Sequence, residues 1–189
     1  MTEFSELLKK RRSIRHFEER EVPLEIIREI IKESCFAPSA ANGQPWRFII
    51  VNNKDLIKKL SDESKRNLLS YIEKNSETAN KKYEAALRNP DFNVFYNAPC
   101  LVFIVGSQEI RNLLVDCALA ASYFMFSATE RGLGTCWVGL GTYVQDSTLI
   151  EIIGMPEDHE IVAPLIVGYP KSIPNAPERN EPKILKIVS

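Results

Sequence analysis

Four short apolar runs, separated by stretches with helical periodicity, constrain the fold of this chain most. "WRFIIV" (46–51) and "CLVFIVG" (100–106) are continuous apolar runs of strand length between turn residues, and each predicts a buried strand. "LGTCWVG" (133–139) and "APLIVGYP" (163–170) predict two more. Helices are expected at 4–12, 23–37, 109–131 and around 147–153. Helices and strands in this uneven order favour an α+β fold over a strictly alternating α/β fold.

The length of the chain, 189 residues, suits one domain with a single core, and we expect residues 1–189 to form it. The polar region 54–88 has few large apolar residues and is expected to form exposed helices. With the residues that follow, it would give a variable helical or flap region at about 54–96. Residues 171–189 contain Pro174, Pro177 and Pro182 and are expected to form an extended C-terminal arm.

Composition excludes several classes of protein. With 24 basic and 25 acidic side chains the net charge is −1, which argues against a general nucleic-acid binder, so any basic site must be local. The N-terminus lacks the order of a secretory signal, and "CALAASYFMFSA" (117–128) is expected to be a buried helix, too short to span a membrane. We therefore expect a cytoplasmic protein that binds neither membrane nor nucleic acid.

Cysteine and histidine patterns do not favour a metal site. The four cysteines lie far apart without a C-x-x-C motif, and the two histidines have no ligand cluster near them. Reduced, packed thiols are expected. The glycines of "GLGTCWVGLG" (132–141) follow a helix and precede a strand, the reverse of a dinucleotide-binding fingerprint. Neither a P-loop nor a G-x-S-x-G elbow is present.

"RRSIR" (11–15) is the first candidate site. Arg11, Ser13 and Arg15 occupy alternate positions, so in an extended chain they project to one side and could converge on one anion. Guanidinium groups and a short hydroxyl donor are the side chains that hold a phosphate best. The alternative is a solvated helix end whose cations complement the helix dipole.

"PSAANGQPW" (38–46) is the second candidate site. A loop with many small side chains allows a flat partner to approach the backbone, and Ser39, Asn42 and Gln44 could hydrogen-bond to a heteroaromatic edge. The alternative is a helix C-terminal turn in which Trp46 anchors the core.

Together these segments resemble the nitroreductase family of FMN-dependent oxidoreductases over most of the chain. The resemblance is carried by "RRSIRHF", "APSAANGQPWRFIIV", "NAPCLVFIV", "ERGLGTCWVG", "IIGMPEDHEIVAPLIVGYP" and a late arginine in "APERNEP", in this order. It implies a nitroreductase-like α+β fold with a central, mainly antiparallel sheet flanked by helices. It also implies an intertwined homodimer with two FMN molecules at the interface and C-terminal arms around the partner.

The resemblance assigns FMN-binding roles by match to the family motifs. Arg11, Ser13 and Arg15 would bind FMN from one subunit, and Arg179 would join Arg11 and Ser13 at the phosphate. Arg12 would contribute mainly backbone contacts.

Further residues are implied around the flavin ring. From the opposite subunit, those facing the isoalloxazine ring would be Pro38, Ser39, Asn42 and Gln44. "TCWVG" (135–139) would run past the flavin and offer backbone amides near N5, from Val138 and Gly139. "RNPDFNVFYNAP" (88–99) does not align with the segment that binds the pyrimidine edge in larger members, so the residue that tunes that edge is unassigned.

The reaction implied is reduction of nitroaromatic, quinone or similar electron-poor acceptors with NADH or NADPH in ping-pong order. No catalytic side chain is expected, because FMN carries the hydride at N5. The region 54–96 would form much of the pocket wall. Two alternatives stay open: the same FMN fold with another reaction, such as reductive dehalogenation, flavin fragmentation or heterocycle oxidation, and a non-enzymatic protein that binds an anion or nucleic acid through "KKRRSIR".

Overall fold

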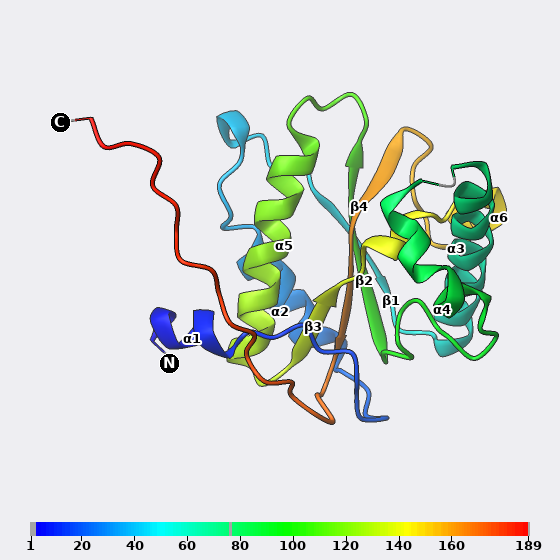
Figure 1. The fold of residues 1–189 in the computed structure, drawn as a ribbon, viewed down its shortest axis with the longest axis horizontal. Coiled ribbons are helices and arrows are strands. Elements are labelled where there is room, and N and C mark those ends of the chain that lie inside the picture. The colour runs from blue at the N-terminus through cyan, green and yellow to red at the C-terminus, as the bar shows by residue number, and fades with distance from the viewer. Residues whose placement is uncertain (1–2, 76, 189) are drawn as a thin grey trace.

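A four-stranded antiparallel sheet lies between two helical layers in the part of the chain that the structure describes (Figure 1). The structure is a computed structural model and describes residues 3–75 and 77–188; residues 1, 2 and 189, at the ends of the predicted domain, and residue 76, in the predicted flap region, lie outside the described residues. In chain order the elements are α1 (Phe4–Lys10), α2 (Leu24–Ser34), η1 (Ala40–Asn42), β1 (Arg47–Val51), α3 (Lys54–Lys74), η2 (Ala79–Tyr83), α4 (Glu84–Arg88), β2 (Cys100–Ser107), α5 (Leu113–Glu130), β3 (Gly134–Trp137), η3 (Gly139–Thr142), α6 (Ser147–Ile152) and β4 (His159–Gly168).

The strand order is β1-β2-β4-β3, and each neighbouring pair is antiparallel. Successive side chains of a strand point to opposite faces of the sheet, so the buried strand β2 supplies two cores. Val102 and Ile104 pack in the cluster under α2 and α5, while Leu101 and Phe103 pack in the cluster under α3. The α+β class and the mainly antiparallel sheet are confirmed.

Two elements differ from their predicted burial. β1 is an edge strand in which Arg47 is exposed and only Val51 is buried, because it has a neighbour on one side alone. α3 is not an exposed helix: one side of it packs against the sheet. Each of its buried residues has another one three or four positions away, so they share one side of the helix. Several are adjacent, and four are polar or charged, which a hydrophobic count misses: Ile57, Leu60, Ser61, Glu63, Ser64, Lys65, Leu68 and Ile72.

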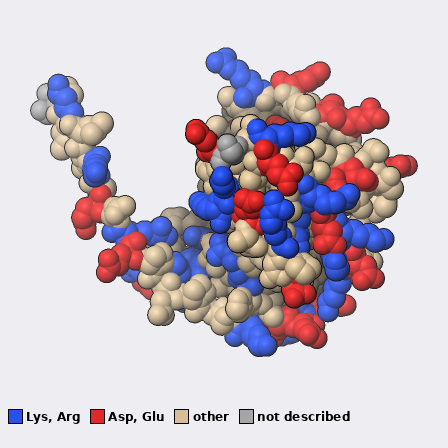
Figure 2. All heavy atoms as spheres, turned by 45° about the vertical axis from the view of Figure 1, so that its right-hand side comes forward, with Lys and Arg blue, Asp and Glu red and all other residues tan. Residues whose placement is uncertain are grey.

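The C-terminal segment 171–188 contains no helix or strand, and its residues are exposed. In Figures 1 and 2 it leaves the body as a thin extension beyond α1 and α5. Figure 2 also shows that lysine and arginine side chains are interspersed with acidic ones over the visible face of the body. The visible face therefore carries both signs of charge rather than one.

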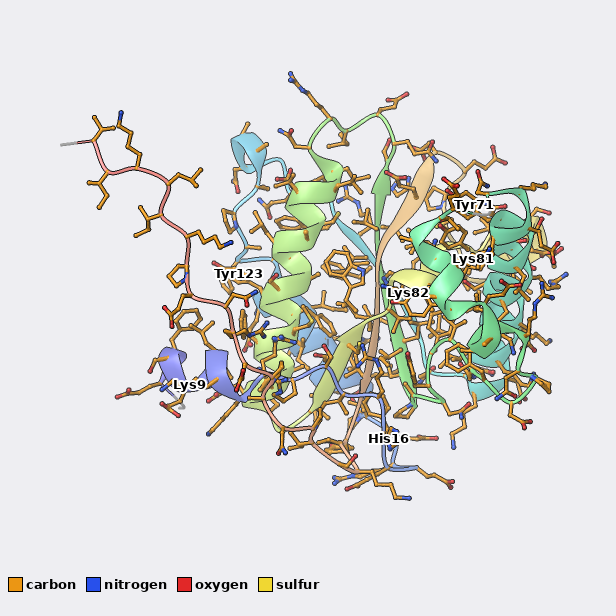
Figure 3. All side chains as sticks on the ribbon, viewed as in Figure 1. Lys9, His16, Tyr71, Lys81, Lys82 and Tyr123 are labelled. Atoms are coloured by element: carbon orange, nitrogen blue, oxygen red, sulfur yellow. The ribbon has the colours of Figure 1, made fainter. Side chains whose placement is uncertain are left out.

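α5 ends in a glycine cap and presents an apolar outer side. The Leu133 amide donates to the Ala128 carbonyl at 2.9 Å around Gly132, whose φ of 73° fits the predicted C-cap. By length and composition alone this helix could cross a membrane, contrary to the sequence expectation, although a core helix passes the same test and 39% of its residues are buried here. Tyr123 lies on the side facing the C-terminal segment (Figure 3), and Leu114, Val115, Leu119 and Tyr123 are all exposed.

Candidate functional site

The segment 11–15 follows α1 and runs beside β3 in an extended conformation. Arg11 has extended backbone angles, with φ −60° and ψ 122°. Ser13 forms a parallel bridge with Thr135, and the Ile14 amide donates to the Thr135 carbonyl at 2.9 Å. Ile14 is buried against Gly134, where any Cβ would lie 2.6 Å from the Ile14 side chain. Since side chains alternate along an extended chain, the inward Ile14 directs its neighbours in the segment outward.

The outward side chains meet the start of the C-terminal segment in a depression of about 480 Å³, which we call the arginine cradle. The structure thus brings Arg179 to the "RRSIR" segment, from which it is separated by most of the sequence. The residues that line the cradle are Arg11, Arg12, Ser13, Arg15, Pro174, Asn175, Pro177 and Arg179.

The cradle carries positive charge that the chain does not neutralise. Among the described residues, Arg11, Arg12, Arg15 and Arg179 take part in no ion pair. Burial, followed by the like charges of Arg12 and Arg179, lowers the pKa of Arg11. Such an arrangement favours a bound anion, which would relieve the repulsion among the guanidinium groups.

Two polar atoms at the cradle are buried without a hydrogen-bond partner. Arg12 donates one Nη to the Asn175 carbonyl at 3.2 Å, but its Nε has no acceptor. Thr135 Oγ1, across the bridge from Ser13, is also unpaired. Buried polar groups are normally paired, so the Nε of Arg12 suits a ligand with an acceptor oxygen, whereas the buried Thr135 does not line the cradle.

A second depression, of about 320 Å³, adjoins the cradle and shares Arg11 and Ser13 with it. Ser122, Met125 and Phe126 of α5 and Trp137 of β3 complete its lining. The two depressions together offer cations at one end and flat, largely apolar side chains at the other. A ligand with a phosphate and a planar ring system fits this order of groups.

The loop 38–44 is strained and lies elsewhere in the same chain. Ala41, Asn42 and Gln44 have φ values of 49°, 55° and 45°, in the region that disfavours residues with a Cβ. The Ala40 amide donates to Asp116 Oδ1 at 3.1 Å. Asp116 lies six residues before Ser122, about 9 Å along α5, and Ser122 is the nearest residue of α5 in the second depression. The structure therefore does not bring this loop to the cradle within one chain.

Inside this loop the predicted residues bind one another. The Gln44 amide donates to Ser39 Oγ at 3.0 Å, and Gln44 Nε2 donates to Asn42 Oδ1 at 3.1 Å. Asn42, Gln44 and Pro38 are exposed, whereas Trp46, which follows the loop, is 4% exposed and packs in the core. In "PSAANGQPW", Trp46 is therefore the core anchor of the second interpretation, and the exposed Asn42 and Gln44 leave the polar loop of the first interpretation on the surface.

Of the two backbone amides predicted to lie near the flavin, one is already hydrogen-bonded within the chain. The Val138 amide donates to the Pro164 carbonyl at 2.8 Å, so it continues the sheet and is not free for a ligand. The Gly139 amide has no acceptor among the described residues. Only the second of the two remains available as a donor.

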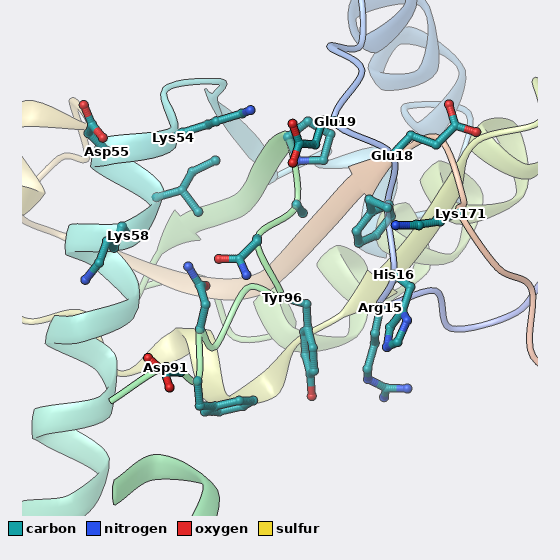
Figure 4. A pocket seen from close by; sticks show the side chains of 17 residues that line it. Arg15, His16, Glu18, Glu19, Lys54, Asp55, Lys58, Asp91, Tyr96 and Lys171 are labelled. Carbon is teal, nitrogen blue, oxygen red and sulfur yellow. The ribbon is translucent and has the colours of Figure 1, made fainter. Parts of the chain in front are cut away.

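Sequence reasoning did not identify Tyr96. The ring centre of Tyr96 lies 5.5 Å from the guanidinium carbon of Arg15. Both residues line a cavity of about 610 Å³ formed by the segment 15–19, the first turn of α3 and the loop 91–99 (Figure 4). Arg15 also lines the cradle, so this side chain stands between the two spaces. A contact between residues so distant in sequence leaves no spacing signal.

Sequence comparison relates most of this chain to a known protein family. A sequence model of the nitroreductase family matches residues 8–169. An Archaeoglobus fulgidus protein, provisionally named an NADH dehydrogenase/NAD(P)H nitroreductase, is 27% identical over 179 residues, which cover 90% of this chain and 87% of the relative.

Two solved structures have the same fold. A nitroreductase with bound FMN from Bacteroides fragilis superposes with a TM-score of 0.83 at 23% identity, over 100% of both chains. An iodotyrosine deiodinase bound to FMN and 3-iodo-L-tyrosine superposes with a TM-score of 0.78 at 25% identity, over 97% of this chain and 99% of the other.

Proposed function

Because the chain belongs to the nitroreductase family, we propose that it is an FMN-dependent oxidoreductase. It uses NADH or NADPH to reduce nitroaromatic, quinone or similar electron-poor acceptors. The observation that carries this proposal is the arginine cradle. It has four guanidinium groups without an acidic partner among the described residues, and it adjoins a depression that Met125, Phe126 and Trp137 help to line.

The residues present fit FMN. Arg11, Ser13 and Arg179 supply charge-assisted hydrogen bonds for a phosphate, and the unpaired Nε of Arg12 is a further donor. Trp137 and its neighbours in the second depression provide a surface for a ring system. The free amide of Gly139 is the backbone donor that we assign to the flavin ring.

Bound FMN supplies hydride transfer at N5, so the chain has to bind, orient and polarise it. The guanidinium groups of the cradle fix the charged end and gain a partner for their charge. Apolar side chains of the second depression exclude water from one side of the site. Because FMN supplies the hydride chemistry, the chain needs no acid or base side chain at the reacting atoms.

The site is completed in a homodimer under this proposal. None of the residues that line the cradle or the second depression comes from the loop 38–44, and the loop is held about 9 Å along α5 from Ser122. A second copy would therefore have to supply it. The exposed apolar side of α5, with Leu114 and Val115 about 63% and 62% exposed, offers a surface for that copy. The C-terminal segment 171–188 would wrap the partner as an arm, and residues 54–96 would form much of the acceptor wall.

Reductive deiodination is the second candidate. It is supported by the similarity to the deiodinase structure with bound FMN and 3-iodo-L-tyrosine, at 25% identity. Both candidates require FMN, so the fate of the acceptor distinguishes them.

The test uses the FMN-loaded protein without oxygen. It is mixed with NADH or NADPH and with a nitroaromatic, a quinone or 3-iodotyrosine, and each product is quantified by chromatography. Turnover of the nitroaromatic or the quinone is expected. Iodide release with neither of these reduced would favour the deiodinase, and a loaded protein that reduces none of the three would overturn both candidates.

A further inference from the structure

The loop 89–97 is fixed to α3 by two buried polar side chains one turn apart. Lys65, 8% exposed, donates from Nζ to the carbonyls of Asn89 at 2.8 Å and Phe92 at 2.9 Å. Ser61, fully buried, accepts from the Val94 amide at 2.8 Å. Residues four apart lie on the same side of a helix, so together they hold the whole first half of the loop against α3.

The second half of this loop adopts a costly backbone conformation. Tyr96 and Asn97 have φ values of 53° and 52°, in the left-handed region that is uncommon for residues with a Cβ. Asn93 closes the turn, because its side chain accepts from the Phe95 amide and its carbonyl accepts from the Tyr96 amide. The fixed first half thus imposes a conformation that places the Tyr96 side chain.

The Tyr96 side chain points at Arg15. Its ring packs edge-on against Phe92, with centroids 5.7 Å apart, and lies 5.5 Å from the guanidinium carbon of Arg15. Figure 4 shows the Tyr96 and Arg15 side chains side by side at the cavity. Among the described residues Arg15 has no carboxylate partner, so the ring face is the group that attracts its charge.

We propose that Tyr96 is a positioning residue that holds Arg15 ready for the anionic cofactor. The proposal rests on the proposed function, since it takes FMN as the ligand of the cradle. Arg15 lines both the cradle and the cavity that contains Tyr96, so the ring restrains this cation from outside the cradle. Tyr96 thereby raises the affinity for FMN through Arg15, without being counted among the phosphate-binding residues.

The test is a double-mutant cycle on the dissociation constant of FMN, measured by titrating the flavin-free protein and following flavin fluorescence. Tyr96→Leu is expected to weaken binding about fivefold, which corresponds to about 1 kcal/mol for a cation–π contact. Tyr96→Phe, which keeps the ring, restores the wild-type constant. In an Arg15→Gln background, Tyr96→Leu changes the constant less than about twofold, because the two residues act as one unit.

A control variant removes a different cation–π contact, the one between Arg20 and Tyr169. Arg20 lies 3.9 Å from the ring centre of Tyr169, outside the cradle, so Arg20→Met should leave the constant for FMN unchanged. If Tyr96→Leu does not fold, Tyr96→Phe is compared with a ring-fluorinated phenylalanine at the same position, which keeps the shape and weakens the ring's negative face. Weaker binding by the fluorinated ring is expected.

Three results would overturn this role for Tyr96: equal binding by the two rings, no effect of Tyr96→Leu, or an effect of the same size with and without Arg15. A wild-type protein that binds no FMN is a different result, because it contradicts the proposed function before Tyr96 is tested.

Discussion

At the scale of single residues, Arg12 and Arg179 repel Arg11 in the cradle, and a bound anion would relieve that repulsion. Replacing Arg11 or Arg179 with alanine should therefore weaken FMN binding, because each removes charge-assisted hydrogen bonds worth about 1.5–3 kcal/mol, or about 10- to 150-fold in the dissociation constant. Fluorescence titration of each purified variant measures the change. Arg66→Ala is the control, since Arg66 is 71% exposed and pairs with Glu63 on α3. Unchanged FMN affinity in both cradle variants would refute the phosphate assignment.

Two cysteines provide a residue-scale prediction that does not involve the ligand. Burial raises the pKa of Cys100 to about 12, and burial together with Asp116 and Glu160 raises the pKa of Cys117 to about 12. A raised thiol pKa contributes stability that is complete below the unfolded value of about 8.5. That stability is lost as the pH rises from there towards 12.

These two thiols should therefore resist a thiol reagent at pH 8 in the folded protein and react once denaturant is added. The midpoint of urea unfolding should fall as the pH rises above about 8.5. Mass mapping of the modified peptides identifies the residues. Rapid modification of Cys100 or Cys117 without denaturant would contradict their burial.

Some site residues could be predicted from the sequence and others could not. Alternation along an extended segment was sufficient to place Arg11, Ser13 and Arg15 on one side. Arg179 came only from the family resemblance, because no local rule brings residue 179 to residue 11. Tyr96 was missed, since its contact with Arg15 depends on a backbone conformation at positive φ that tyrosine rarely adopts.

At the scale of elements, the buried lysine on α3 has a role in stability. Lys65→Met should lower the free energy of unfolding by about 2–4 kcal/mol, because it leaves buried carbonyls of the loop 89–92 without their charged donor. Urea denaturation measures the loss. Lys58→Met, on the same helix, is the matched control: its pair with Asp62 is exposed and should cost less than about 0.5 kcal/mol. Equal losses in the two variants would show that Lys65 does not fix the loop.

Apolar runs and capping signals located the main elements well. β2 and the Gly132 cap of α5 lie where the sequence predicts them, because a long apolar run and a glycine after a helix have few other interpretations. β4 includes most of the run predicted at 163–170 but begins earlier, at His159. α3 was predicted to be exposed because the region 54–88 has few large apolar residues, but Ser61, Ser64 and Lys65 are also buried on it. The structure buries them because loop backbone groups provide their hydrogen bonds.

At the scale of the whole molecule, the outer side of α5 is predicted to be the dimer surface. Val115→Asp should give a monomer in sedimentation velocity and weaken FMN retention, because dimerisation would bury an unpaired charge. Ile152→Asp is the control, since Ile152 on α6 is 57% exposed and lies outside the proposed surface. A Val115→Asp protein that sediments as the wild-type dimer would place the interface elsewhere.

The assembly is the level at which the sequence was least informative. A pattern of apolar residues predicts burial but does not say whether the same chain or a partner covers them. Leu114 and Val115 on α5 are apolar and yet exposed in this chain. Only the structure shows that they lie on the side of α5 that faces away from the sheet. A partner for this side was implied by the family resemblance alone.

The visible absorption spectrum of the protein tests most directly whether this chain is a flavoenzyme. The purified protein, supplemented with FMN and freed of excess, should be yellow, carry one FMN per chain by chromatography, and bleach without oxygen on addition of NADH or NADPH. A protein that stays colourless and retains no FMN would contradict the account, and the arginine cradle would then need another anion.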